Sequence, residues 1–340
     1  MSGYFIERPE QIKVSVTNIC NYKCVMCYNP TLKQARDMIS DDLMFSIMDQ
    51  CVEAGIPKLS IGGTGEPMLH PRFVDYVVEA KRRGLWVSTT SNCSVLTEER
   101  TRTLLDAGID RFNISIYSST PDEHREYTKT DLFETAAERV KYFIRTARER
   151  GAKTQINVFF LPLKGINSYE RYREYWGPFL KDAGLECVMK DEMNWAGLVK
   201  HMGSTNEWRV EENAFGRHEV VQRTKIPCPH LRYYLHILHD GSVLPCCNIP
   251  YSYGNSVVEF GNVNTERILD IWKKPQYLMF KEEHSRRNTN FPFCTRCTDV
   301  YTIRRAELSV RGVGDVLVRL SRRLTGASRQ PVSGDPTNIQ

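Results

Sequence analysis

Strand-like segments that alternate with helix-like segments are the feature that most constrains the fold of this chain. Short apolar or alternating runs recur with helical patterns between them, which is typical of βα units. Because parallel strands joined by helices cross over in the right-handed sense, such units form an open doubly wound sheet or an incomplete barrel. Six runs fit strands: Ile12 to Val16, Leu59 to Gly62, Trp86 to Thr90, Phe112 to Ile116, Ile156 to Leu161 and Glu186 to Met189.

The ends of the expected helices carry residues that suit helix termini. The segment Ser40 to Asp42 fits the start of the first helix, and Thr97 to Glu99 fits the start of the third, because a hydroxyl followed by acidic residues caps the free backbone N–H groups. Glycine is suited to the position just after a helix. Five glycines fit that position: Gly55, Gly84, Gly108, Gly151 and Gly184.

The βα pattern lapses after Gly197, and this change predicts the domain organisation. We expect a barrel-like domain over residues 1–197 and a bridge over 198–227. A second, smaller domain is expected over 228–301, with a hairpin that runs from Tyr233 through a turn to Cys246. Over residues 302–340 we expect a basic helix that docks on the protein, followed by a flexible tail.

Composition limits the class of protein. The 340 residues are 41% hydrophobic, enough for a large core and a smaller appended unit, and no run approaches the roughly 20 apolar residues of a membrane helix. The net charge of +5 is spread over the chain, so nucleic acid and membrane are not expected as partners. Without an export signal the protein is expected to be cytoplasmic, and its eleven cysteines are then metal ligands or reduced thiols.

Three cysteines follow the first expected strand with the spacing C-x3-C-x2-C. They are Cys20, Cys24 and Cys27. A short loop can turn three thiolates toward one point, and three thiolates on a four-iron cluster leave one iron open to an external ligand. The alternatives are a zinc loop and buried structural thiols, but structural zinc sites use four ligands.

This loop resembles the signature of the radical S-adenosylmethionine (SAM) superfamily, and the similarity covers about residues 10 to 195. The resemblance implies an α/β fold, a partial (β/α)6 TIM-like barrel. It also implies a [4Fe-4S] cluster whose open iron binds SAM, and a 5′-deoxyadenosyl radical that abstracts a substrate hydrogen. A reductase such as flavodoxin or ferredoxin is the implied electron donor.

The resemblance also implies a set of SAM-binding residues. The segment Gly62 to Pro67 is similar to the family's Gly-Gly-Glu-Pro segment, in which the acid holds the SAM ammonium. Polar residues at strand ends contact SAM in the family, although serine or asparagine there can instead be turn residues. The matching positions are Met26, Gly62, Gly63, Gly65, Glu66, Ser91, Asn92, Ser115 and Tyr117.

A second group of cysteines lies near the C-terminus. Cys228, Cys246, Cys294 and Cys297 give four thiolates, which could bind zinc or an iron–sulfur cluster. The region is similar to the SPASM/Twitch extension of radical SAM enzymes, which implies a C-terminal auxiliary cluster domain. No cysteine follows Cys297, so we expect a single auxiliary [4Fe-4S] cluster and two clusters in all. Cys247 is the rival to Cys246, and the glycine spacing favours Cys246.

Radical SAM enzymes that have one auxiliary cluster suggest which reaction to expect of this chain. The spacing resembles radical SAM enzymes of antibiotic pathways, such as a 2-deoxy-scyllo-inosamine dehydrogenase and a cytosylglucuronate decarboxylase. Both imply hydrogen abstraction from a carbinol carbon of a sugar, cyclitol or nucleoside, followed by oxidation or decarboxylation. After the sixth strand, Lys190, Asp191 and Glu192 are the candidate catalytic residues, unless they are solvated loop residues.

Two other classes of function stay open. Many SPASM proteins modify ribosomal peptides, and against this reading only nineteen residues precede Cys20, too few for a separate peptide-recognition domain. A non-enzymatic iron–sulfur carrier is the third alternative. The open three-thiol site and the glycine-rich segment Gly62 to Pro67 argue against it.

Overall fold

The fold is known from a computed structural model of the chain. It describes residues 5–32, 35–163, 165–190, 208–212, 218–225, 228–247, 252–253, 256–257, 259–286, 294, 297 and 301–307. The chain divides into two compact units. One contains residues 1–205 and 224–302, and the other contains 206–223 and 303–340. Each unit is described by itself.

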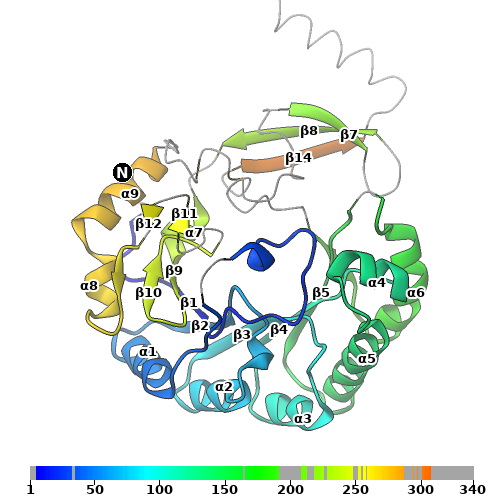
Figure 1. Cartoon of the computed structure of the whole chain (residues 1–340), viewed down its shortest axis with the longest axis horizontal. Helices are drawn as coiled ribbons and strands as arrows, with labels where there is room; N and C mark the ends of the chain where they lie inside the picture. Colours follow the sequence, from blue (N-terminus) through cyan, green and yellow to red (C-terminus); the bar gives the residue numbers. More distant parts are fainter. Residues whose placement is uncertain are drawn as a thin grey trace, which may run out of the picture. The chain divides into compact units, whose positions relative to one another are not determined.

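A nine-stranded sheet forms the centre of the first unit, in the order β13-β10-β9-β1-β2-β3-β4-β5-β6 (Figure 1). Strands β1 to β6 are parallel, and each pairs with the next along the chain. This arrangement confirms the predicted partial barrel. Its strands are β1 (Gln11–Ser15), β2 (Lys58–Gly62), β3 (Trp86–Ser91), β4 (Arg111–Ser115), β5 (Gln155–Phe160) and β6 (Cys187–Met189).

Helices follow the parallel strands and cover the outer face of the sheet (Figure 1). Ser40 caps α1 by accepting a 3.3 Å hydrogen bond from Leu43 N, and Thr97 caps α3 by accepting one of 3.2 Å from Arg100 N. Both caps agree with the sequence prediction. The helices are α1 (Asp41–Glu53), α2 (Phe73–Arg82), α3 (Glu98–Asp106), α4 (Pro121–Thr128), α5 (Phe133–Glu149) and α6 (Tyr169–Asp182).

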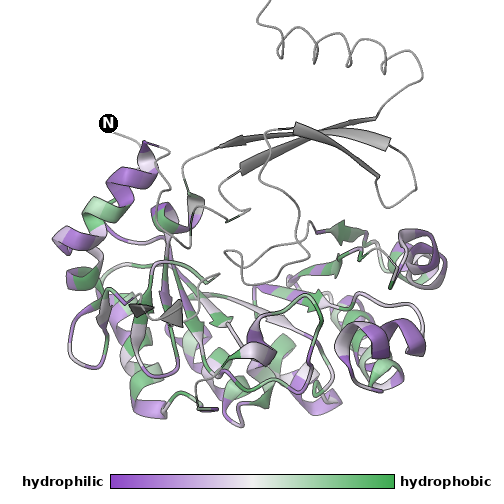
Figure 2. Cartoon of the chain, turned by 45° about the horizontal axis from the view of Figure 1, so that its top comes forward, coloured by the Kyte–Doolittle hydropathy of each residue, from purple (hydrophilic) through white to green (hydrophobic). Residues whose placement is uncertain are grey.

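Successive side chains of a strand lie alternately in the core between sheet and helices and in the barrel interior. Ile12 and Val14 of β1 are buried in the core between sheet and helices, whereas Lys13 between them lines a cavity. In the same core, the ring of Phe112 packs 4.2 Å from that of Phe143 on α5. The helices carry both hydrophobic and hydrophilic residues (Figure 2), as expected for elements with one buried face.

The hairpin predicted near the C-terminus is present, but it continues the barrel sheet. Strand β9 (Tyr234–Ile237) pairs with β10 (Ser242–Leu244) in the antiparallel sense. It also pairs in parallel with β1, with Lys13 opposite His236. The helices α8 (Ile268–Trp272) and α9 (Pro275–Ser285) follow the hairpin. Helix α8 contacts the N-terminal segment, because Trp272 Nε1 donates a 3.0 Å hydrogen bond to Ile6 O. The short strand β13 (Gly261–Asn262) pairs with β10.

A three-stranded sheet in the order β14-β8-β7 was not expected from the sequence. Strand β7 (Trp208–Glu212) pairs with β8 (His218–Lys225) in the antiparallel sense, and both lie in the predicted bridge. Strand β14 (Tyr301–Glu307) begins at the end of the predicted second domain and continues into the predicted tail. Charged residues interrupt these strands, so their period is weaker than that of the buried strands.

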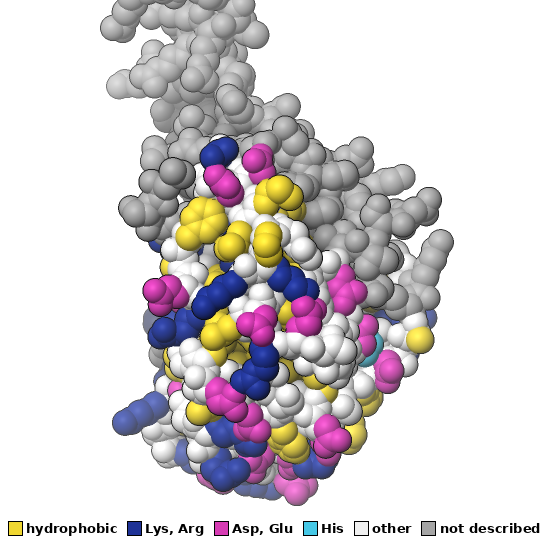
Figure 3. Space-filling model, turned by 90° about the vertical axis from the view of Figure 1, so that its left-hand side faces the viewer, with side chains coloured by type: hydrophobic (Ala, Val, Ile, Leu, Met, Phe, Trp, Pro, Cys, Tyr) yellow, Lys and Arg dark blue, Asp and Glu magenta, His cyan; other side chains and the backbone are white. Residues whose placement is uncertain are grey.

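Acidic and basic side chains lie interspersed on the described part of the face in Figure 3. Ion pairs of the first unit include Arg267 with Glu53 and Lys274 with Glu266. Among the described residues, no helix is both long and apolar enough to span a membrane.

Candidate active site

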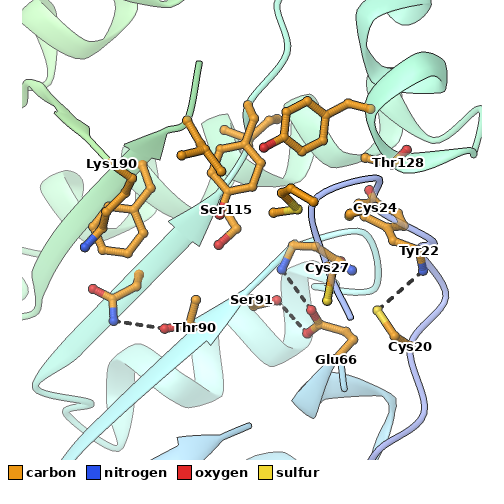
Figure 4. Close-up of a pocket in the computed structure, with 18 of the residues that line it drawn as sticks. Cys20, Tyr22, Cys24, Cys27, Glu66, Thr90, Ser91, Ser115, Thr128 and Lys190 are labelled. Carbon is orange, nitrogen blue, oxygen red and sulfur yellow. Dashed lines mark hydrogen bonds between the residues drawn. The ribbon is translucent and has the colours of Figure 1, made fainter. Parts of the chain in front are cut away.

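A cavity of about 710 Å³ opens beside the cysteine loop in the first unit. Most of the residues predicted to bind the cluster or SAM line this one space, and Lys190 lies across it from the three cysteines (Figure 4). Gly62 does not line it, and Asp191 and Glu192 lie outside the described residues. The predicted residues that line the cavity are Cys20, Cys24, Cys27, Met26, Gly63, Gly65, Glu66, Ser91, Asn92, Ser115, Tyr117 and Lys190.

Backbone hydrogen bonds fasten the cysteine loop to the end of α4. Lys23 N donates to Thr128 O at 2.9 Å, and Val25 N donates to Tyr127 O at 3.0 Å. Within the loop, Cys27 N donates to Cys24 O at 3.0 Å and forms a turn. The loop is therefore held in shape by its neighbours before any ligand binds.

The three thiols of this loop suit a positively charged metal group. Burial raises the pKa of Cys20 to about 11, and burial together with the neighbouring Cys20 and Cys27 raises the pKa of Cys24. The thiols are thus neutral until a metal group replaces their protons. Tyr22 N and Asn29 N lie 3.5 Å and 3.4 Å from the Sγ atoms of Cys20 and Cys27, where they can stabilise thiolates.

Glu66 is a buried carboxylate with hydrogen-bond donors around it. Its oxygens accept from Ser91 Oγ at 2.7 Å, Asn92 N at 2.8 Å and Met68 N at 3.2 Å. Burial outweighs these bonds and raises its pKa to about 7, so the carboxyl is neutral below that pH and ionised above it. An ammonium group beside it would favour the ionised form, and Glu66 therefore fits the predicted partner of the SAM ammonium.

Ser91 and Asn92 have structural partners that the sequence did not indicate. The Ser91 hydroxyl donates to Glu66 and accepts from Cys93 N at 2.9 Å. The Asn92 amide donates to Asn21 Oδ1 at 3.1 Å, and its carbonyl oxygen accepts from Ser94 Oγ at 2.7 Å. Both residues hold the walls of the cavity, and their contact with SAM stays a prediction.

Two glycines of the Gly62 to Pro67 segment, Gly63 and Gly65, lie directly against other residues of the protein. A Cβ at Gly63, whose φ is +117°, would lie 1.9 Å from Ser15 Oγ, and a Cβ at Gly65 would lie 2.3 Å from Ile19 O. The sequence resemblance placed these glycines among the SAM-binding positions. In the structure their first role is to let the loop after β2 pack against the loop that carries the cysteines.

A side chain that the sequence did not single out joins the same two loops. Asn29 Nδ2 donates to Asn18 O at 2.9 Å and to Thr64 O at 2.6 Å. Asn29 is buried, and it lies two residues after the third cysteine of the motif. An asparagine in a loop has many ordinary roles, so its position alone could not reveal this one.

The second group of cysteines lies partly in the core of the same unit. Cys228, Cys294 and Cys297 are buried, and Cys246 packs against the core cluster that contains Cys228 and Cys294. Cys247 instead lines the cavity. Among the described residues, no three His, Cys, Asp or Glu side chains are grouped closely enough to hold a single metal ion.

A histidine on α9 contacts one of these thiols. His284 is fully buried, and its Nε2 lies 3.2 Å from Cys294 Sγ. Its Nδ1 lies 2.8 Å from Phe280 O and must be the donor, because a carbonyl oxygen only accepts. This bond fixes the ring beside the thiol, as outer residues do for metal ligands.

The environments of Cys246 and Cys247 predict different effects of replacing them. Cys246→Ala should remove more of the auxiliary cluster than Cys247→Ala, because Cys246 packs against the core cluster to which two other predicted ligands belong, whereas Cys247 lines the cavity. Iron content and cluster spectroscopy of the reconstituted variants measure this difference. A larger loss of iron in Cys247→Ala would identify Cys247 as the ligand.

Comparison with known proteins identifies the class of protein that this fold and cavity define. Residues 14–172 match the radical SAM superfamily, and residues 228–298 match the SPASM iron-sulfur cluster-binding domain. The chain therefore contains a radical SAM domain followed by an SPASM domain. These domains confirm the prediction of a [4Fe-4S] cluster, SAM and an auxiliary iron–sulfur site, whereas the number of auxiliary clusters stays a prediction.

Relatives of known sequence differ in what they act on. A tungsten-containing aldehyde ferredoxin oxidoreductase cofactor-modifying protein of Pyrococcus furiosus is 24% identical over 313 residues, which cover 84% of this chain and 86% of that protein. A probable GTP 3′,8-cyclase of Methanosarcina mazei is 32% identical over 164 residues, which cover 47% of each chain. The predicted sugar-like substrate is not confirmed by these relatives.

Solved structures support the fold. The crystal structure of BtrN in complex with AdoMet and 2-DOIA has a TM-score of 0.55 and 18% identity, and the match covers 88% of this chain and 95% of BtrN. That of Streptococcus suis SuiB bound to the precursor peptide SuiA has a TM-score of 0.64 and 14% identity, and covers 87% of this chain and 71% of SuiB. At these identities the likeness concerns the fold.

Proposed function

We propose that this radical SAM enzyme abstracts hydrogen from a carbinol carbon of a polar small molecule such as a sugar, cyclitol or nucleoside. The observation that carries the proposal is that one and the same cavity is lined by the cysteine loop, Glu66 and polar residues of the barrel interior. When bound, the cluster and SAM supply the 5′-deoxyadenosyl radical that abstracts the hydrogen. A substrate bound beside the polar residues of this cavity would lie in the same space as the cysteine loop.

The residues of this chain bind and orient the reactants. Glu66 holds the ammonium of SAM, and Ser91 holds Glu66 through its 2.7 Å hydrogen bond. Tyr117 lines the cavity and is neutral, because burial raises its pKa to about 12. It can therefore donate a hydrogen bond without changing charge at neutral pH.

Two outcomes of the reaction are compatible with this arrangement. Oxidation to a ketone removes two electrons from the substrate and would make the protein an oxidoreductase. One electron leaves with the hydrogen atom that the 5′-deoxyadenosyl radical takes, and the auxiliary cluster would accept the other from the substrate radical as its hydroxyl proton is lost. Decarboxylation of a uronate releases carbon dioxide without net oxidation and makes it a lyase. A reductase such as flavodoxin or ferredoxin supplies the electron that starts the reaction.

Substrate-dependent formation of 5′-deoxyadenosine tests the proposal. Sugars, cyclitols, nucleosides and their uronates are compared with short peptides, and each product is assayed for a ketone or for carbon dioxide. Stimulation by a member of the polar group supports the proposal, and stimulation by peptides alone would replace it with peptide modification.

Lys190→Ala should slow the substrate-dependent step about tenfold or more while both clusters stay intact, because a contact with a charged group contributes about 1.5–3 kcal/mol. The Lys190 Nζ lies 4.0 Å from the centre of the Phe159 ring, within the cavity wall. Single-turnover rates and iron content measure the effect. A wild-type rate in this variant would show that Lys190 does not act on the substrate.

A further inference from the structure

Three cationic side chains line the cavity in addition to the predicted SAM-binding residues. Lys13, Arg111 and Lys190 line the same space as the cysteine loop. Among the described residues that line it, Glu66 is the one acidic side chain. Glu66 already has three hydrogen-bond donors around it and is assigned to SAM. The other charged side chains of the described lining, Lys13, Arg111 and Lys190, are therefore cationic.

Arg111 is held in place by neighbours that do not neutralise it. It is the first residue of β4, and its guanidinium lies 4.9 Å from the centre of the Trp86 ring. Its Nε donates to Gln155 Oε1 at 2.9 Å, and a guanidinium has four further N–H donors. In the described part of the chain no carboxylate forms an ion pair with it. The Arg111 side chain is thus held in one orientation and still has N–H donors that a ligand can use.

Lys13 presents a second cation from another strand. Its Nζ lies 4.1 Å from the centre of the Tyr234 ring, and no ion pair with a described carboxylate holds it. Cations facing one cavity repel one another, and the repulsion is stronger where protein limits the access of water. A bound anion would relieve this repulsion and use the donors that Arg111 leaves over.

Neutral polar groups form a row beside these cations. Asn157 Nδ2 donates to Asn113 Oδ1 at 2.8 Å, and Asn113 Nδ2 donates to Thr90 Oγ1 at 3.1 Å. Because the Thr90 hydroxyl accepts from Asn113, its own proton is available to another acceptor. Thr90 and Asn157 also line the cavity and offer a donor and an acceptor to substrate hydroxyls.

We propose that the substrate carries an oxyanion, a carboxylate or a phosphate, which Arg111 and Lys13 bind inside the barrel. The hydroxyl-bearing part of the substrate then lies along the row from Asn157 to Thr90, and the reacting carbon faces the cysteine loop. The position of the reacting carbon rests on the proposed function. The anion site itself rests on the cations and needs no radical chemistry.

Binding of inorganic phosphate tests the anion site in the reconstituted full-length protein with SAM bound. Phosphorus NMR line width against protein concentration should show binding to the wild type. Arg111→Gln should weaken this binding about tenfold or more, because charge-assisted hydrogen bonds to an anion are lost. Lys13→Gln, a change in a different strand, should also weaken it, and circular dichroism reports whether each variant is folded.

Lys58→Gln is the matched control. Lys58 lies over the same Trp86 ring, 5.9 Å from its centre, but it does not line the cavity. Its replacement removes the same charge and should leave phosphate binding unchanged. Absence of phosphate binding to the wild type, or equal weakening by Lys58→Gln and Arg111→Gln, would overturn the proposal.

Competition separates the two oxyanions. Acetate that displaces phosphate supports a site for carboxylates, and acetate that does not displace it supports a site for phosphate esters. The result is independent of the proposed reaction. If phosphate binds as described but no sugar, cyclitol or nucleoside supports turnover, the proposed function fails and the anion site stands. If turnover occurs and Arg111→Gln leaves phosphate binding unchanged, the anion site fails alone.

Discussion

Replacing Cys20, Cys24 and Cys27 together with alanine is expected to abolish reductive cleavage of SAM and to remove about half of the iron. Two four-iron clusters give about eight irons per chain after anaerobic reconstitution, and these three thiols line the cavity beside Glu66. Iron content and the yield of 5′-deoxyadenosine with a chemical reductant measure both effects.

The matched control for this variant is Cys51→Ala. Cys51 is fully buried on α1 in the hydrophobic core and does not line the cavity. Its replacement should keep the full iron content and SAM cleavage, with at most a modest loss of stability. SAM cleavage that persists in the triple variant would show that the C-x3-C-x2-C motif does not hold the catalytic cluster.

Gly65→Ala is expected to remove the first cluster as effectively as loss of its ligands. The added Cβ would lie 2.3 Å from Ile19 O and 2.8 Å from Thr17 O, and these backbone atoms must move. Because Ile19 directly precedes Cys20 and Thr17 lies three residues before it, the movement shifts the cysteine loop. We expect a loss of about four irons per chain and of SAM cleavage, while the spectroscopic signal of the auxiliary cluster remains.

Gly62→Ala provides the comparison for that change. A Cβ at Gly62 meets no atom within 4 Å, and Gly62 lies three residues away in the same segment. Its iron content should therefore equal that of the wild type. Equal iron content in both variants would show that packing of the two loops does not position the cluster ligands.

The parallel part of the fold could be predicted from the sequence because its signals are local. Each strand from β1 to β6 falls in an apolar or alternating run of about the right length, and each observed strand lies within a residue or so of the expected range. Ser40 and Thr97 act only on backbone groups three residues away. Such contacts depend on neighbouring residues, which a single sequence displays.

Contacts between distant segments could not be predicted in this way. Strand β9 adds to β1 although Lys13 and its partner His236 are far apart in the chain, and neither strand encodes its neighbour. The pairing of β7 with β8 was missed because β8 does not alternate regularly: Val220 and Val221 are adjacent, and four polar residues follow them.

Some residues of the candidate site could likewise be predicted from the sequence, and others could not. The cysteine motif and Glu66 are recognisable because their residue types and spacing are unusual, and the structure brings them to one cavity. Arg111 and Asn157 were not singled out, because polar residues that alternate with apolar ones are ordinary in a strand. Only the closure of the sheet makes such residues face one another. The roles of Asp191 and Glu192 stay predictions.

Transfer of deuterium tests the central claim most directly. A polar substrate that supports turnover is deuterated at the carbinol carbon and incubated with the enzyme, SAM and a reductant, and 5′-deoxyadenosine is analysed by mass spectrometry. The proposed function predicts one deuterium in 5′-deoxyadenosine from this substrate and none from the same molecule labelled at another carbon. Unlabelled 5′-deoxyadenosine from the carbinol-labelled substrate would contradict it, as would label arriving only from a deuterated peptide.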